Sequence, residues 1–248
     1  RCDGPLDYSA VTIAHMGHWA CTRCGHARPT PDVRATRVTL DGMRGQRIVI
    51  ESDGERVEAE LPLAGLHNTY NATAAAATAL SLGVPASVIG PALSGRAAAF
   101  GRGEVIAVGD RELVLLLAKN PAGANENVHT LLLDDEPLDL LILLNDRAAD
   151  GRDISWIWDV DYELLVPHVR SLTVSGDRAW DLALRFRYAG LPSERMVVIP
   201  EVSRALDAAL TLAPESGRLH VLPTYTALLD LRSRLRRRGV VDAFWRDG

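Results

Sequence analysis

The strongest constraint on the fold is the alternation of short apolar runs with amphipathic segments from residue 104 onward. The apolar runs predict strands at 104–108, 112–118, 138–145, 170–174, 196–200 and 218–222. The amphipathic segments predict helices at 122–133, 178–189, 202–212 and 224–237. Segment 138–144 is almost continuously apolar, which is typical of a strand buried on both faces of a parallel sheet. The pattern therefore predicts an α/β fold with right-handed crossovers.

The first hundred residues follow a different pattern. Residues 1–35 are rich in turn formers and lack a periodic apolar pattern, whereas 36–63 predict a β-hairpin. An alanine-rich helix is predicted at 66–82 and a short helical stretch at 86–95. The pattern breaks at 97–103, so we expect two domains, at 1–96 and 97–248.

Composition excludes several classes of protein. The net charge is −5 and charged residues make up 24% of the chain, which gives no nucleic-acid footprint. No apolar run reaches the roughly 18 residues that a membrane span needs, and no charged-then-apolar leader is present, so we expect a cytoplasmic protein. The chain opens on Arg1-Cys2 in mid-motif and without a methionine. We therefore expect that it belongs to a longer natural protein.

Three cysteines within the first 24 residues predict a local metal clip. Cys21 and Cys24 flank a tight bend in the form of a zinc knuckle, and Cys2 resembles the end of a second knuckle. Structural zinc takes four ligands, so the fourth would be a cysteine three residues before Cys2, or one of His15, His18 and His26. Such a zinc ribbon, at about 1–35, would be structural because a filled ligand set leaves no open position. The alternative is three free thiols in a loop.

The start of the predicted helix at 66–82 carries three polar side chains, His67, Asn68 and Asn71. Asn68 and Asn71 are three residues apart and therefore share one face. An amide presents a donor and an acceptor side by side, which suits the edge of an adenine. The alternative is structural: Asn68 or Thr69 caps the helix and His67 is an exposed loop residue.

An acidic loop with two tryptophans follows the most apolar predicted strand. Its carboxylates and tryptophans are Asp146, Asp150, Asp153, Trp156, Trp158, Asp159, Asp161 and Glu163. Ligand sites in open α/β sheets lie beyond the carboxyl ends of strands, and aromatic side chains beside carboxylates can anchor a partner protein. The alternative is a solvated acidic loop whose tryptophans pack in the core.

Two familiar kinds of site are missing from the sequence. No glycine-rich phosphate loop with its lysine occurs, and residues 41–46 lack the lysine and resemble a turn. No Ser-His-Asp or Cys-His arrangement has the spacing of a hydrolase nucleophile. Hydrolase nucleophile chemistry within these residues is therefore not expected.

Four motifs in order resemble the Mur ligase family, and in particular its MurT branch. His-Asn-Thr-Tyr-Asn-Ala at 67–72 is similar to the signature helix of the Mur ligase central domain. Phe-Gly-Arg-Gly-Glu at 100–104 is similar to the motif that opens the C-terminal domain. Lys119 stands where ordinary Mur ligases carry a histidine. This lysine, the cysteine ribbon, and Asp-Gly-x-Asp-x-Ser-Trp-Ile-Trp-Asp at 150–159 resemble MurT.

The resemblance implies a fold and an activity. Residues 1–96 would be part of a Mur ligase central ATP-binding domain with an inserted zinc ribbon, and 97–248 a Rossmann-like α/β C-terminal domain of the MurT type. The family's enzyme is the glutamine-hydrolysing lipid II isoglutaminyl synthase, a heterodimer with a GatD-type glutamine amidotransferase. The amidotransferase releases ammonia from glutamine. The MurT subunit activates the α-carboxylate of D-glutamate in lipid II with ATP and Mg²⁺, and ammonia then gives D-isoglutamine. The implied cofactors are ATP, Mg²⁺ and Zn²⁺.

The resemblance also implies the roles of individual residues. Asn68 and Asn71 would lie against the adenine, and His67 near the phosphates and the metal. Arg102 would reach the ribose or phosphates, and Lys119 and Asn120 would line the same cleft. Asp159 would complete the partner's Cys-His pair in trans, with Asp150 and Asp153 as alternatives. Cys2, Cys21 and Cys24 would bind the zinc.

The chain departs from the family pattern in one respect, and two other functions remain open. The family's phosphate loop and its magnesium-binding glutamate should precede the zinc ribbon, where this sequence has no residues. The resemblance therefore implies that these 248 residues alone do not bind ATP tightly or catalyse the reaction. One rival function is another amide-forming Mur ligase that adds an amino acid. The second is a non-catalytic zinc-ribbon scaffold that only docks a partner.

Overall fold

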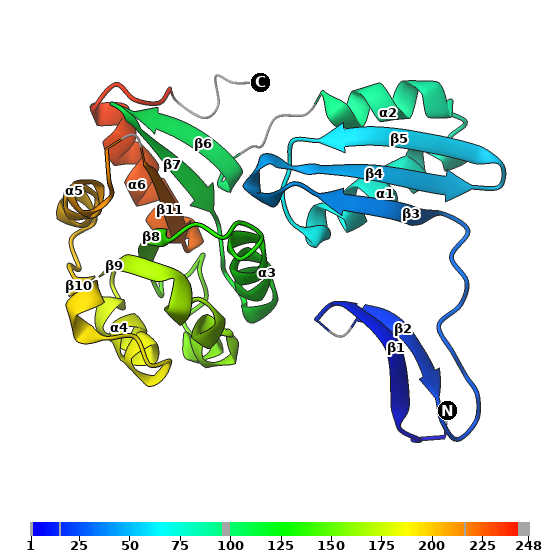
Figure 1. The fold of residues 1–248 in the computed structure, drawn as a ribbon, viewed down its shortest axis with the longest axis horizontal. Coiled ribbons are helices and arrows are strands. Elements are labelled where there is room, and N and C mark those ends of the chain that lie inside the picture. The colour runs from blue at the N-terminus through cyan, green and yellow to red at the C-terminus, as the bar shows by residue number, and fades with distance from the viewer. Residues whose placement is uncertain (1, 15, 96–99, 216, 243–248) are drawn as a thin grey trace. The chain divides into compact units, whose positions relative to one another are not determined.

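The structure is a computed structural model that describes residues 2–14, 16–95, 100–215 and 217–242. The chain divides into two compact units, Arg1–Arg96 and Ala97–Gly248 (Figure 1). Each unit has its own sheets and helices and is described by itself.

Unit 1 begins with an antiparallel hairpin of β1 (Leu6–Ile13) and β2 (Met16–Cys21). The sequence pattern predicted no strand within residues 1–35. Most of β1 is exposed, so the strand has no buried face to produce an alternating apolar pattern. The hydroxyl oxygens of Thr12 and Tyr70 lie 2.6 Å apart and join the hairpin to the rest of the unit.

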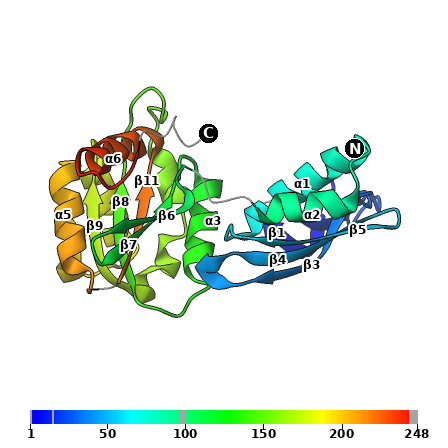
Figure 2. The same ribbon diagram turned by 90° about the horizontal axis from the view of Figure 1, so that it is seen from above.

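The rest of unit 1 is a three-stranded antiparallel sheet that packs against two helices (Figure 2). Its strands are β3 (Arg34–Leu40), β4 (Gln46–Ser52) and β5 (Glu55–Leu61), and its helices are α1 (Leu66–Ser81) and α2 (Ala86–Ser94). The antiparallel pairing of β4 with β5 confirms the predicted hairpin, and alternate residues of β5 are buried. Gly90 lets α2 approach β5, because a Cβ there would lie 2.4 Å from the carbonyl oxygen of Glu58.

A glutamine side chain from β4, rather than a capping side chain of α1, fixes the start of α1. Gly65, at φ +86°, is the N-cap residue, so the prediction that Asn68 or Thr69 caps the helix is wrong. Buried Gln46 donates from Nε2 to the carbonyl oxygens of Leu63, at 2.9 Å, and Gly65, at 3.0 Å. The hydroxyl of Thr69 donates to Oε1 of the same glutamine. One buried amide thereby orients the first turn that carries the predicted nucleotide contacts.

Unit 2 is built on a six-stranded mixed sheet in the order β10-β9-β8-β11-β7-β6. The five parallel strands are β7 (Arg111–Leu116), β8 (Leu138–Leu143), β9 (Val169–Ser175), β10 (Met196–Val198) and β11 (Arg218–Pro223). The edge strand β6 (Arg102–Val108) pairs antiparallel to β7. Every residue of β8 is buried, as the continuous apolar run predicted.

Four helices cover the two faces of this sheet. They are α3 (Pro121–Leu131), α4 (Ala179–Tyr188), α5 (Val202–Leu212) and α6 (Tyr225–Arg237). Apolar residues of α5 and α6 share one buried cluster with β7, β8 and β11. The crossovers from β7 to β8 and from β9 to β10 run one way across the sheet, and the crossover from β10 to β11 runs the other way. Because all three are right-handed, α3 and α4 cover the face opposite to α5 (Figure 1).

The strand order brings the predicted site elements of unit 2 to one edge of the sheet. The parallel strands β7 and β8 both end at this edge, so Lys119 and the acidic loop follow their strands there. The loop at 144–168 contains three short 3-10 turns, at Ser155–Asp159, Tyr162–Leu164 and Val166–His168. Among the described residues, no helix is both long and apolar enough to cross a membrane.

Candidate functional site

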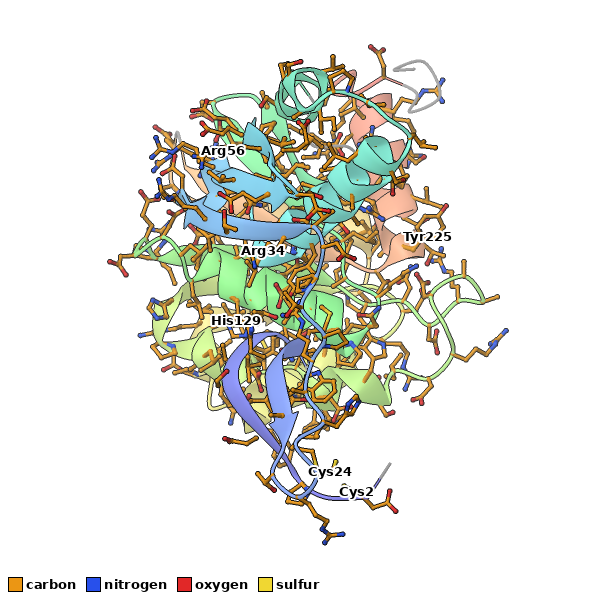
Figure 3. All side chains as sticks on the ribbon, turned by 90° about the vertical axis from the view of Figure 1, so that its right-hand side faces the viewer. Cys2, Cys24, Arg34, Arg56, His129 and Tyr225 are labelled. Carbon is orange, nitrogen blue, oxygen red and sulfur yellow. The ribbon has the colours of Figure 1, made fainter. Side chains whose placement is uncertain are left out.

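The three cysteines meet at one end of the β1–β2 hairpin, where Figure 3 labels Cys2 and Cys24. All three sulfur atoms lie within 4.8 Å of one another, and those of Cys2 and Cys21 are 3.4 Å apart. The absence of a side chain at Gly4 leaves space for the sulfur atoms, because a Cβ there would lie 2.9 Å from the sulfur of Cys21. Corners of a tetrahedron around zinc, with Zn–S bonds of about 2.3 Å, are roughly 3.8 Å apart. The cluster therefore fits three ligands of a zinc ion.

Backbone dipoles favour a thiolate at the centre of this cluster. The N–H of Cys24, and then that of Arg23, lower the pKa of the Cys21 thiol to about 7. A hydrogen bond with Cys24 is the main cause that raises the pKa of Cys2. Among the described residues no histidine belongs to the cluster: His26 instead stacks edge-on against Trp19, at 5.3 Å. His15 lies outside the described residues, and the fourth ligand stays a prediction.

Of the two asparagines at the start of α1, one is buried and one is exposed to solvent. Asn68 is buried, and its Nδ2 donates to the carbonyl oxygen of Ala64 at 2.8 Å and lies 3.1 Å from Nε2 of His67. Asn71 is exposed and donates from Nδ2 to Oδ1 of Asn68 at 3.3 Å. The side-chain oxygen Oδ1 of Asn71 accepts no hydrogen bond from the described residues. Asn71 is therefore the amide best placed to meet a ligand, while Asn68 orients it.

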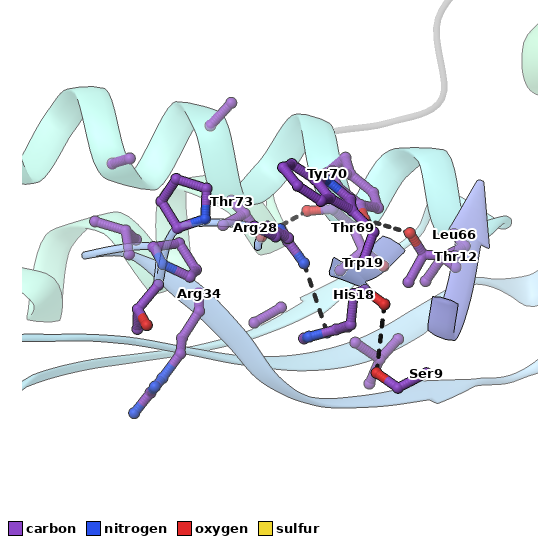
Figure 4. A pocket seen from close by; sticks show the side chains of 18 of the residues that line it. Ser9, Thr12, His18, Trp19, Arg28, Arg34, Leu66, Thr69, Tyr70 and Thr73 are labelled. Carbon is purple, nitrogen blue, oxygen red and sulfur yellow. Dashed lines mark hydrogen bonds between the residues drawn. The ribbon is translucent and has the colours of Figure 1, made fainter. Parts of the chain in front are cut away.

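A cavity of about 680 Å³ lies on another side of α1, between the hairpin, residues 28–35 and β3 (Figure 4). Thr69, Tyr70 and Thr73 of α1 line it, together with Trp19 and Arg28. The described lining residues do not include His67, Asn68 or Asn71. The predicted nucleotide contacts therefore do not open into this cavity.

In the Gly-Arg-x-Glu motif of unit 2, the glutamate is bonded within the unit and the arginine is exposed. Glu104 accepts from the backbone N–H of Gly101 at 3.0 Å and from Arg232 of α6 at 2.5 Å. The Arg232 guanidinium also lies over the ring of Phe100, at 5.3 Å. Arg102 is exposed, and no described residue pairs with its guanidinium. The glutamate thus fixes the strand that presents the arginine.

Lys119 and Asn120 lie between β7 and α3, and both are exposed. The side-chain oxygen of Asn120 accepts from the N–H of Gly123 at 2.8 Å and caps α3. Lys119 is left at the sheet edge with its ammonium exposed. The six predicted nucleotide contacts therefore come three from each unit, and a nucleotide cleft that uses both units stays a prediction.

The three candidate aspartates of the acidic loop differ in their partners. The carboxylate of Asp150 accepts from the N–H of Thr226 at 2.8 Å and from its hydroxyl at 2.5 Å, and so caps α6. Asp153 accepts from the N–H of Ser155 at 2.8 Å, and this bond lowers the pKa of Asp153. The carboxylate of Asp159 is exposed and has no partner among the described residues, and Asp161 resembles it. Asp159 is therefore the member of the candidate trio that is available to another molecule.

Two residues that the sequence analysis did not single out hold this loop. The side chain of Arg185 on α4 is only 4% exposed, and it bonds to the loop at Ile157, Val160 and Glu163. Asn125 on α3 bonds to the backbone at Asp159 and Asp161. An arginine on the otherwise apolar buried face of the predicted helix 178–189 was the sequence signal for the first of them.

An exposed apolar face on α4 continues from the loop. Trp180, Leu184 and Tyr188 recur every fourth residue with 68%, 52% and 73% of their surfaces exposed. Trp158 of the loop is 48% exposed and meets Tyr188 edge-on, with ring centroids 5.4 Å apart. The alternative in which the loop tryptophans pack as core is therefore wrong for Trp158. We call these four residues the α4 face.

The sequence is similar to proteins of known function. Residues 117–228 match the protein family described as MurT ligase C-terminal. The chain is 36% identical over 242 residues to the Streptococcus pneumoniae protein named lipid II isoglutaminyl synthase (glutamine-hydrolyzing) subunit MurT, covering 97% of this chain and 53% of that protein. It is 29% identical over 239 residues to the Staphylococcus aureus protein of the same name, covering 96% and 52%. The chain thus spans about half the length of the curated relatives it matches.

A solved structure shares the fold. The pseudomurein peptide ligase type C from Methanothermus fervidus superposes with a TM-score of 0.73 at 21% sequence identity. The match covers 96% of this chain and 48% of that one. The chain therefore has a Mur ligase-like α/β fold, with a mixed sheet in unit 2.

Proposed function

We propose that the chain, whose residues 117–228 match the MurT ligase C-terminal family, serves in the ATP-dependent amidation of the D-glutamate α-carboxylate of lipid II. In this proposal it works in the cytoplasm as a heterodimer with a GatD-type glutamine amidotransferase. The chemistry is consistent with its parts: a carboxylate is a poor electrophile, and phosphoryl transfer from Mg-ATP supplies a leaving group. Ammonia from glutamine then displaces phosphate, giving D-isoglutamine, ADP and phosphate.

The observation that carries the proposal is the acidic turn within the region that matches the MurT C-terminal family. Of its candidate aspartates, Asp150 and Asp153 are bound to backbone N–H groups, whereas the carboxylate of Asp159 is exposed. A carboxylate that bonds to a histidine fixes its tautomer and stabilises its protonated form during nucleophilic catalysis. We assign this role to Asp159, acting in trans on the Cys-His pair of the amidotransferase.

The α4 face supports a docking site for this partner. Trp158 stands directly before Asp159, and its contact with Tyr188 makes the apolar face continuous with the turn that carries the aspartate. Exposed tryptophan and tyrosine side chains are the residue types that dominate protein interfaces. A subunit that receives Asp159 in its active site would cover this face at the same time.

The nucleotide contacts are proposed from exposure and partners. Asn71 would contact the adenine, and Arg102 and Lys119 would contact the ribose or phosphates, because all three are exposed. Asn68 and Asn120 would act mainly by holding their neighbours, since each bonds to nearby backbone. His67 would lie toward the phosphates and Mg²⁺. The cysteine cluster would hold a structural Zn²⁺.

The test is glutamine hydrolysis by the whole protein in complex with its amidotransferase. We expect Asp159→Asn to abolish glutaminase activity and to leave partner binding intact. Asp161→Asn is the matched control, because this nearby carboxylate is also exposed while its backbone N–H bonds to the same Asn125. Normal hydrolysis by Asp159→Asn would refute the assignment.

The same complex separates the rival functions. Incubation with lipid II, glutamine and ATP should yield a product lighter by about one mass unit, as expected when a hydroxyl becomes an amide. A ligase that adds an amino acid would give a much heavier product. A docking scaffold would show no glutamine-dependent ATP turnover on lipid II.

A further inference from the structure

The turn that carries Asp159 is held by one planar group from α4. Arg185 donates from Nε to the carbonyl oxygen of Ile157 at 3.1 Å and from one terminal nitrogen to that of Val160 at 2.6 Å. Its two terminal nitrogens also bind the carboxylate of Glu163, each at 2.8 Å. The guanidinium thus fixes the loop at three points. These are Ile157 before Asp159, Val160 directly after it, and Glu163 four residues beyond it.

The surroundings of Arg185 make this grip rigid. Its guanidinium carbon lies 5.6 Å from the ring centre of Trp158 and 5.4 Å from that of Tyr162. Contact with aromatic faces and burial both favour one orientation of a guanidinium. A lysine has the charge but not the planar fork, and it could not reach two carbonyls and both carboxylate oxygens at once.

A second clamp comes from α3 on the opposite flank of the turn. Asn125 donates from Nδ2 to the carbonyl oxygen of Asp159 at 3.2 Å. Its Oδ1 accepts from the N–H of Asp161 at 2.8 Å. One amide therefore bonds to the main chain on both sides of Val160, so the backbone of Asp159 itself is fixed while its carboxylate stays exposed.

We propose that Arg185 and Asn125 are positioning residues that hold the Asp159 carboxylate at the place where it meets the histidine of the partner's glutaminase. This inference rests on the proposed role of Asp159. Neither residue bonds to that carboxylate, so both act through the backbone. Their effect is large because a displacement of about 1 Å in a reacting group can cost about 100-fold in rate.

The first experiment uses Arg185→Lys in the whole protein, in complex with its amidotransferase. We expect kcat for glutamine hydrolysis to fall by about 10- to 100-fold, with KM for glutamine unchanged because the partner binds the glutamine. Arg111→Lys is the control. Arg111, whose side chain is 21% exposed, likewise binds a carboxylate and a backbone carbonyl, those of Asp110 and Ala213, but it does not contact the loop.

The pH profile separates positioning from general loss of structure. A nearby carboxylate raises the pKa of a histidine, so a displaced Asp159 lets the pKa of the partner's histidine fall. The acidic limb of kcat/KM should therefore move to lower pH in Arg185→Lys. A lower rate with an unmoved acidic limb would mean that the arginine only stabilises the fold, and would overturn the inference.

The remaining outcomes also support or overturn the positioning role of these two residues. If Arg185→Lys does not bind the partner, Asn125→Ala takes its place, with the same expected fall in kcat and the same shift of the acidic limb. Wild-type rates in both variants, with Asp159→Asn inactive, would overturn the inference and leave the role of Asp159 intact. An active Asp159→Asn would overturn both.

Discussion

At the scale of residues, partners decide the roles of chemically identical side chains. Asp150 and Asp159 lie in one loop, yet the first caps a helix and the second is exposed. Asn68 and Asn71 lie on one helix, yet the first is buried against its own backbone and the second is at the surface. In each pair, the member whose polar atoms are already bonded stabilises the fold, and the other is left for a ligand or a partner.

The prediction at this scale concerns Asn71. In the whole protein, Asn71→Ala should weaken ATP binding by about 1–2 kcal/mol, the usual scale of one lost hydrogen bond in a binding site. Titration calorimetry with a non-hydrolysable ATP analogue measures the change. Thr78→Ala is the control, because Thr78 lies two turns further along the same exposed side of α1. Equal affinity in both variants would mean that this side of the helix merely packs.

At the scale of elements, the sequence predicts well wherever burial follows a regular period. The predicted helices at 66–82 and 202–212 match α1 and α5 within one residue, and the run at 138–144 contains β8. The strands β1 and β2 were missed because β1 has almost no buried side chains, so no alternation marks it. The antiparallel direction of β6 was not predicted either, because an apolar pattern does not carry strand direction.

The candidate site was less predictable than the fold. The acidic loop could be identified from its composition, but its clamps depend on where α3 and α4 meet it. The contact of Asn125 has no signature in local sequence, because Asn125 and Asp159 are far apart along the chain. Arg185 was the exception that could have been found, since a charge on the buried face of an amphipathic helix requires a partner.

The β1–β2 hairpin gives the element-scale prediction. It has little apolar burial of its own, so a metal ion should supply much of its order. The purified whole protein should contain about one zinc ion per chain, and Cys21→Ser should lose it. Elemental analysis measures the zinc, and hydrogen exchange should show faster exchange across residues 6–21 in the variant. A zinc-free preparation with full exchange protection in the hairpin would contradict the prediction.

At the scale of the whole molecule, the chain carries two sets of groups that we propose for two different reactions. Asn71 in unit 1, with Arg102 and Lys119 in unit 2, belongs to the proposed nucleotide chemistry. Asp159 and the α4 face belong to the proposed glutaminase. Unit 2 contributes to both, since Lys119 and the acidic loop follow strands of one sheet. In this proposal, the partner therefore docks on the same sheet that carries groups of the ligase reaction.

The last prediction tests that assembly through the α4 face. Leu184→Asp places a charge where an apolar partner surface should desolvate it, so the affinity for the amidotransferase should fall by at least about 30-fold, or about 2 kcal/mol. Leu212→Asp is the matched control, because Leu212 is a leucine of similar exposure near the end of α5, 46% against 52%. Titration of the whole protein with its amidotransferase measures both affinities. Equal binding of the two variants would mean that the partner approaches Asp159 from another side, because no tight interface accepts an unpaired buried carboxylate without a large loss.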